Sequence, residues 1–251
     1  MRTRRDAGAT RVTAGLAVLC AMSMSTAACG GGATAPTTTV APVERVDVDP
    51  TLLQLPGNDS QHAVASSVAA AMAQADYTVA GTVVGWQEGA AEISDWRDGQ
   101  GDRSLTALME VAVEVSYGSE QAPSTVYVEL WRGEDAVDKS GRQVPLGKDR
   151  AYNVLPLEQL AHGAPASARV LVIGARVPAA TASDTDVVPA AVPDSATVLR
   201  PIAQGLWFED ADGSLVNGLL PSEDAFVGTW PGADSGGRAT FAELVDEVAK
   251  G

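Results

Sequence analysis

Two neighbouring segments of the sequence alternate between apolar and polar residues, and this pattern limits the folds open to the chain. Residues 105–117 read LTALMEVAVEVSY and residues 124–131 read STVYVELW. Successive side chains of a β-strand point to opposite faces, so a period of two is typical of a half-buried strand. Residues 118–123 contain Gly and Pro and form a turn between the two runs. We therefore expect a β-hairpin with one buried face.

Turn residues, caps and β-branched runs predict the remaining elements. The expected helices are residues 60–76, with N-cap candidates Asn58, Asp59 and Ser60, and residues 240–249, with a capping box formed by Thr240 and Glu243. The expected further strands are residues 77–86, 148–156 and 168–177, and a hairpin is expected over residues 205–220 that turns at residues 211–213. Residues 87–104, 132–146 and 178–201 are polar or rich in Ala and Pro, and they are predicted as loops.

These elements predict one mainly-β domain of about five to seven strands with an N-terminal and a C-terminal helix. Residues 75–83 (ADYTVAGTV) lead from the first helix into a strand, and a long strand, its hairpin partner and two later strands follow. This order resembles the five-stranded OB-like barrels of secreted bacterial proteins. The resemblance runs from residue 77 to residue 177 and implies a small OB-like barrel.

The N-terminus has the three parts of an export signal. Basic residues stand at Arg2, Arg4 and Arg5, residues 12–24 are uncharged, and small residues lead to Cys29. The apolar stretch is shorter than the roughly 20 residues of a membrane-spanning helix. The pattern resembles the lipobox of bacterial lipoproteins, which implies a diacylglycerol on the Cys29 thiol. An ordinary cleaved signal peptide is the alternative.

The predicted organisation is a signal peptide over residues 1–28, a lipid anchor and flexible Gly/Thr/Pro tether over residues 29–58, and a globular domain over residues 59–251. In composition the chain also resembles uncharacterised lipoproteins of high-GC Gram-positive bacteria. The resemblance implies an extracytoplasmic location, with the protein held on the outer face of the cell membrane by lipid.

The charge of the mature chain excludes several partners. Residues 1–28 contain four of the 17 basic residues and one of the 32 acidic residues, which leaves 13 and 31 and a net charge of −18. Such a surface repels nucleic acid and anionic lipid headgroups. Cys20 lies in the predicted signal peptide and Cys29 carries the predicted lipid, so no cysteine is left for a disulfide, a nucleophile or a zinc site.

No motif for catalysis, a cofactor or a metal is present. His62 and His162 stand alone, without the spacing of a zinc hydrolase, and are interpreted as surface residues. Residues 210–213 (DADG) match the start of a calcium-binding loop, but the following residues lack the further oxygen ligands of such a loop. An Asp-Gly hairpin turn is therefore predicted.

The predicted acidic loop 87–104 is the candidate binding surface. It contains five acidic residues, four of which, Glu88, Glu92, Asp95 and Asp98, lie close to Trp86, directly before the loop, and Trp96 within it. These two tryptophans are the tentative partner-binding residues, because an indole stacks well on a sugar or a side chain. Trp131, Trp207 and Trp230 are interpreted as packing residues.

The sequence favours a non-enzymatic binding or accessory module of the cell envelope, whose partner is an envelope protein, a wall polymer or a small ligand. The alternative is a carboxylate-based hydrolase acting on wall polymers, since paired acids beside aromatic residues are typical of sugar-cleaving sites. A transporter's solute-binding lipoprotein is disfavoured because the chain is rich in strands and shows no pair of α/β lobes.

Overall fold

A computed structural model describes residues 45–54, 64–118, 120–145, 153–178 and 187–251. The predicted signal peptide, Cys29, most of the tether and His62 lie outside these ranges. The strands are β1 (Tyr77–Arg97), β2 (Gln100–Tyr117), β3 (Thr125–Asp138), β4 (Asn153–Val154), β5 (Arg169–Arg176), β6 (Val187–Val188), β7 (Thr197–Glu209) and β8 (Leu215–Asn217). The α-helices are α1 (Val68–Met72), α2 (Leu157–Gly163), α3 (Ser222–Ala225) and α4 (Phe241–Val248), and two 3-10 turns are η1 (Pro50–Leu52) and η2 (Ala233–Ser235).

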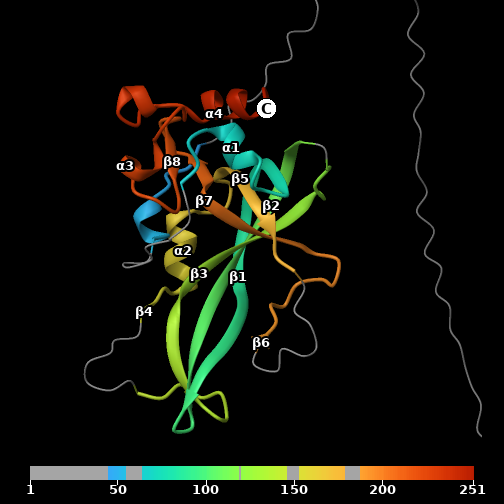
Figure 1. The fold of residues 1–251 in the computed structure, drawn as a ribbon, viewed down its shortest axis with the longest axis vertical. Helices are drawn as coiled ribbons and strands as arrows, with labels where there is room; N and C mark the ends of the chain where they lie inside the picture. Colours follow the sequence, from blue (N-terminus) through green and yellow to red (C-terminus); the bar gives the residue numbers. More distant parts are fainter. Residues whose placement is uncertain (1–44, 55–63, 119, 146–152, 179–186) are drawn as a thin grey trace, which may run out of the picture. The chain divides into compact units, whose positions relative to one another are not determined.

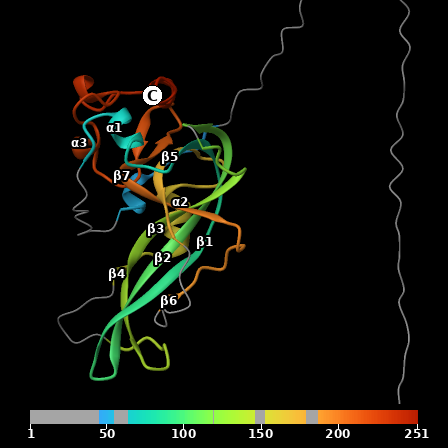
Figure 2. The same cartoon turned by 45° about the vertical axis from the view of Figure 1, so that its right-hand side comes forward.

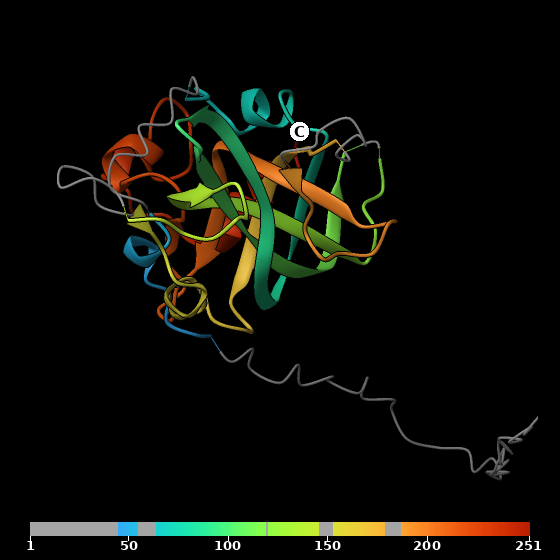
Figure 3. The same ribbon diagram turned by 90° about the horizontal axis from the view of Figure 1, so that it is seen from below.

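Five of the strands close into a barrel (Figures 1 and 3). β1, β2 and β3 form an antiparallel meander, and β5 pairs antiparallel with both β1 and β7. A short parallel ladder between β3 and β7, from Val126↔Thr197 to Val128↔Leu199, completes the ring. Helix α2 lies in the chain between β3 and β5. The predicted mainly-β class and the small β-barrel are confirmed.

The described residues form two apolar cores, one inside the barrel and one outside it. Val170 and Val172 of β5 point inward with Phe208 of β7, whereas Leu171 and Ile173 point outward. The outer core also contains Trp207, whose ring lies 5.2 Å from that of Phe226 and 5.3 Å from that of Trp230. Helices α1, α3 and α4 supply the other side of this core. Both faces of β5 are therefore buried, which explains its continuous apolar run.

Beyond the barrel, β1, β2 and β3 continue as a three-stranded extension (Figures 1 and 2). The prediction of a loop over residues 87–104 is wrong, because β1 runs to Arg97 and β2 starts at Gln100. Asp98 and Gly99 turn the chain with φ of 50° and 82°. Two successive residues with positive φ are typical of the tight hairpin turn that matches the twist of the strands. The polar composition misled the prediction because β1 and β2 are only partly buried in the extension, although Asp135, Ala136 and Val137 of β3 are buried there.

Three other predicted boundaries are wrong. β3 extends into the predicted loop 132–146, and β7 begins inside the predicted loop 178–201, because both strands gain ladder partners far along the chain. The first helix is only five residues long, and the Oγ atom of its N-cap Ser67 accepts a hydrogen bond from the Ala70 amide. His162 belongs to α2 and not to a loop, and it is exposed.

Other predictions are confirmed. β5 occupies the expected position, and β7 and β8 form the expected hairpin, with Gly213 at φ 85° in its turn. Helix α4 has the complete capping box, since the Thr240 hydroxyl accepts from the Glu243 amide and the Glu243 carboxylate accepts from the Thr240 amide. Phe241, Leu244 and Val248 of this helix are buried.

Residues 45–54 pack on the barrel. Val48 and Leu53 are buried in the inner core, and Arg45 forms an ion pair of 2.9 Å with Glu209 of β7. The Asp49 amide donates to the Gly163 carbonyl, where α2 ends. The folded part thus includes residues ahead of the predicted domain start at residue 59.

Candidate functional site

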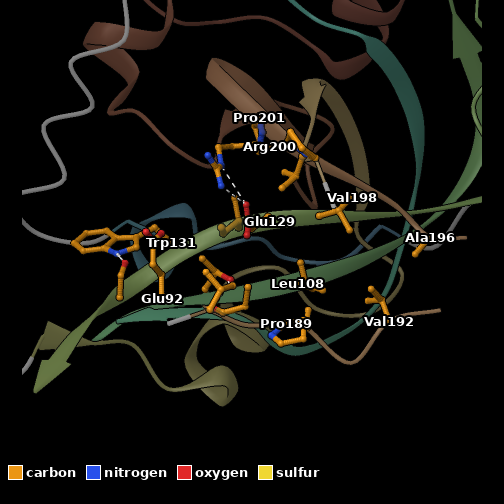
Figure 4. Close-up of a pocket in the computed structure, with 18 of the residues that line it drawn as sticks. Glu92, Leu108, Glu129, Trp131, Pro189, Val192, Ala196, Val198, Arg200 and Pro201 are labelled. Atoms are coloured by element: carbon orange, nitrogen blue, oxygen red, sulfur yellow. Dashed lines mark hydrogen bonds and ion pairs between the residues drawn. The ribbon is translucent and has the colours of Figure 1, made fainter. Parts of the chain in front are cut away.

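A pocket of about 770 Å³ lies on the outward face of β1, β2 and β3. Residues 187–196, which lead from β6 into β7, cover it from the other side (Figure 4). β6 fixes one end of this cover by pairing with β1, in the register Ala91↔Val188 and Glu92↔Val187. The site is therefore formed where the three-stranded extension meets the connection between β5 and β7.

Strand alternation decides which side chains face the pocket. On β2, Ala107 and Met109 belong to the inner core, so their neighbour Leu108 points to the opposite face. On β3, Glu129 and Trp131 share the outward face for the same reason. The ladder places Leu108 opposite Glu129. Residues from two strands thereby form one continuous pocket floor.

One end of the pocket is polar and aromatic (Figure 4). Glu129 of β3 has a side chain only 7% exposed, and its Oε2 accepts from Nε and Nη2 of Arg200 at 3.1 and 2.6 Å. The Arg200 side chain is 65% exposed. The Trp131 indole N–H donates to Ser104 Oγ at 2.9 Å, and Glu92 of β1 lies opposite Ser104 in the ladder. The hydrogen bond fixes the indole ring against the pocket floor.

The other end of the pocket is apolar. Figure 4 shows Leu108 between Val198 above it and Pro189 and Val192 below it, with Ala196 to the right. Two prolines, Pro189 and Pro193, are in the covering segment. Because proline fixes its own φ, they restrict the conformations of the cover. The pocket is thus amphipathic along its length.

Of the two tryptophans predicted to bind a partner, Trp86 lies outside this pocket. Trp86 packs against the inner core, and its indole N–H donates to the Ala164 carbonyl at 2.8 Å, next to α2. Trp96 lies near the tip of the extension, and its side chain is outside the described part of the structure. Trp86 does not line the pocket.

The aromatic residue that the structure does place in the pocket is Trp131, which the sequence assigned to packing. Its position at an outward-facing site of an alternating strand was visible in the sequence. The sequence did not show that residues 187–196 cover this face of β3, because no pattern in that segment predicts its pairing with β1. Glu92 lies in the acidic segment singled out earlier, and it does line the pocket.

The remaining candidates from the sequence have local structural roles. Gly213 donates to the Asp210 carbonyl, and the Asp210 carboxylate accepts from the amides of Val48 and Ala211, as expected of a hairpin turn. Within residues 45–251, apart from the segments not described, no group of three or more His, Cys, Asp or Glu side chains is arranged to hold a metal ion.

Comparisons of the chain with protein-family models, with curated proteins and with solved structures gave no match in any of the three. In the part of the chain that the structure describes, no helix has both the length and the apolar character needed to cross a membrane. The features that bear on function are therefore the pocket and the sequence of the N-terminus.

Proposed function

We propose that the protein is a membrane-anchored lipoprotein of the cell envelope, attached through lipid on Cys29, and that its OB-like barrel is a non-enzymatic binding module. The observation that carries the binding role is the pocket on the outward face of β2 and β3. This face is the one on which OB barrels hold their ligands.

The pocket has the properties of a site for a small ligand. Its volume of about 770 Å³ lies within the range of known small-molecule sites, roughly 300–1,000 Å³. Its lining is mainly apolar, with a few polar groups at one end, which is also typical of such sites. A wall polymer or an envelope protein would contact the rim and leave much of this volume unfilled, so the shape favours a small ligand.

The N-terminal sequence supports the anchor and the extracytoplasmic location. Residues 12–24 have the length of a signal-peptide core, and Cys29 follows directly on small residues. A mature chain with a net charge of −18 gains nothing from anionic headgroups, so attachment must come from the acyl chains. Two or more chains suffice for stable anchoring.

The anchor is tested by expressing the full chain and a Cys29→Ser variant in a bacterium that processes lipoproteins. We expect the native protein to sediment with membranes, with a mature N-terminus at Cys29 and the added mass of diacylglycerol. The variant is expected in the soluble fraction. A native protein that stays soluble with residues 1–28 attached would refute the anchor.

The pocket is tested by filling it. Ala196 lines the pocket, whereas Ala191 is exposed on the same covering segment and does not line it. We expect Ala196→Trp to abolish the binding of Nile red, a neutral apolar dye, and Ala191→Trp to leave it unchanged. Equal dye binding by all three proteins, with unchanged melting temperatures, would refute the pocket as a ligand site.

One observation favours a second candidate, the hydrolase of wall polymers: Glu92 and Glu129 line the same pocket. Glycoside hydrolysis uses two carboxyl groups on either side of the scissile bond. Against this role, Glu129 is held in an ion pair, because Arg200 donates two hydrogen bonds to its Oε2 atom. Release of sugars from purified wall material by the native protein, lost in both Glu92→Gln and Glu129→Gln, would establish the hydrolase instead.

A further inference from the structure

The lining of the pocket has an acidic surplus. Its charged lining residues are Glu92, Glu129, Asp194 and Arg200, so Arg200 is the one basic side chain among the described residues that line it. Arg200 donates twice to Glu129, and this pair contributes no net charge. Glu92 and Asp194 are exposed and form no ion pair with another described residue.

An aromatic ring lies beside these carboxylates. Trp131 is two residues from Glu129 on the same face of β3, which separates their Cα atoms by about 7 Å. The indole N–H is occupied by Ser104 Oγ, so the ring interacts with a ligand through its π surface. Tryptophan attracts cations most strongly of the aromatic side chains, and quaternary ammonium groups are recognised in this way.

We propose that the ligand of this pocket is a cationic amphiphile, with its positive group between Trp131 and Glu92 and its apolar part under the cover formed by residues 187–196. This inference rests on the proposed binding function and names the chemical class of the ligand. The apolar end, with Leu108, Val192 and Val198, receives the hydrocarbon part. An anionic amphiphile would meet the acidic surplus and bind less well.

The test compares three probes with the same alkyl chain and different headgroups: decyltrimethylammonium, decyl maltoside and decyl sulfate, all below their micelle concentrations. Isothermal titration calorimetry on the full-length protein gives each Kd. We expect the cation to bind tightest and the sulfate weakest, with a separation of roughly tenfold or more between them. Added sodium chloride should weaken the binding of decyltrimethylammonium and leave the binding of decyl maltoside unchanged, because salt screens only the charged headgroup.

Single substitutions assign this preference to the named residues. Glu92→Gln and Trp131→Leu should each raise the Kd of decyltrimethylammonium by roughly threefold to tenfold and change the Kd of decyl maltoside little. Glu223→Gln is the matched control, since Glu223 is exposed on α3 and does not line the pocket. It changes the net charge by the same amount and should leave all three constants unaltered.

The outcomes separate the ligand class from the binding function. Equal affinities, or tighter binding of the sulfate or the maltoside, would overturn the cationic class. Such binding would still support a ligand pocket if Ala196→Trp abolished it. Binding of none of the three probes would also overturn the class, and the Nile red comparison then decides the proposed function on its own.

Discussion

Removing Arg200 from its ion pair with Glu129 should destabilise the fold much more than removing Glu129. The two side chains join β3 to β7 beside the parallel ladder that closes the barrel. Glu129 is 7% exposed and Arg200 is 65% exposed. Loss of Arg200 leaves a carboxylate buried without its cation, whereas loss of Glu129 leaves a guanidinium that water already reaches.

The exposures set the expected magnitudes. Arg200→Ala removes two charge-assisted hydrogen bonds to one buried oxygen and should lower the free energy of unfolding by about 2–3 kcal/mol. Glu129→Leu replaces the buried carboxylate by an apolar side chain and leaves the exposed Arg200 to water, so it should cost less than about 1 kcal/mol. In the double variant, Glu129→Leu should recover most of the stability lost in Arg200→Ala.

Urea unfolding followed by far-UV circular dichroism measures these differences from the midpoint and slope of each transition. The slopes should agree among the four proteins, because each unfolds the same surface. Equal destabilisation by the two single variants would refute the asymmetry. A neutral Arg200→Ala would show that the carboxylate is hydrated and that the pocket floor is more open than the structure indicates.

Three further predictions concern other parts of the fold. The side-chain hydrogen bond from Ser140 is the main cause that lowers the pKa of Asp138 to about 2. The ionised carboxylate therefore stabilises the fold fully above the unfolded pKa of 3.8, and this stability is lost as the pH falls through 2. Ser140→Ala should raise the pKa of Asp138, as measured by NMR titration. Thr240→Ala removes the hydroxyl that caps α4 at Glu243 and should cost about 1 kcal/mol in thermal unfolding, while Thr240→Ser should cost much less. Phe208→Ala opens a cavity inside the barrel and should cost about 3–5 kcal/mol, which a melting temperature within a degree of the native value would contradict.

The sequence predicted the elements whose pattern is set by one buried face or by local capping. The sequence correctly predicted β5, the β7–β8 hairpin and α4. Continuous burial, a turn with positive φ and a capping box each require a recognisable pattern of neighbouring residues. The extension beyond the barrel was missed, because its β1 and β2 segments are polar and only partly buried, and its pairing with β3 depends on residues far apart in the chain.

The candidate site was predictable only in part. Glu92 came from an acidic segment that the sequence singled out, whereas Trp131 needed the knowledge that the face of β3 opposite the core is covered by residues 187–196. Trp86 was chosen as a binding residue because it adjoins the acidic segment, yet its indole donates to Ala164 beside α2. The choice between the two tryptophans depends on strand register and on a long-range contact, and neither is encoded in local sequence.

Native mass spectrometry of the protein extracted from its own membrane tests the binding role most directly. The wild-type chain should carry a small molecule that is released on denaturation, Ala191→Trp should carry the same molecule, and Ala196→Trp should carry none. If all three proteins had the same mass before and after denaturation, the pocket would hold no retained ligand and the binding role assigned to this barrel would be wrong.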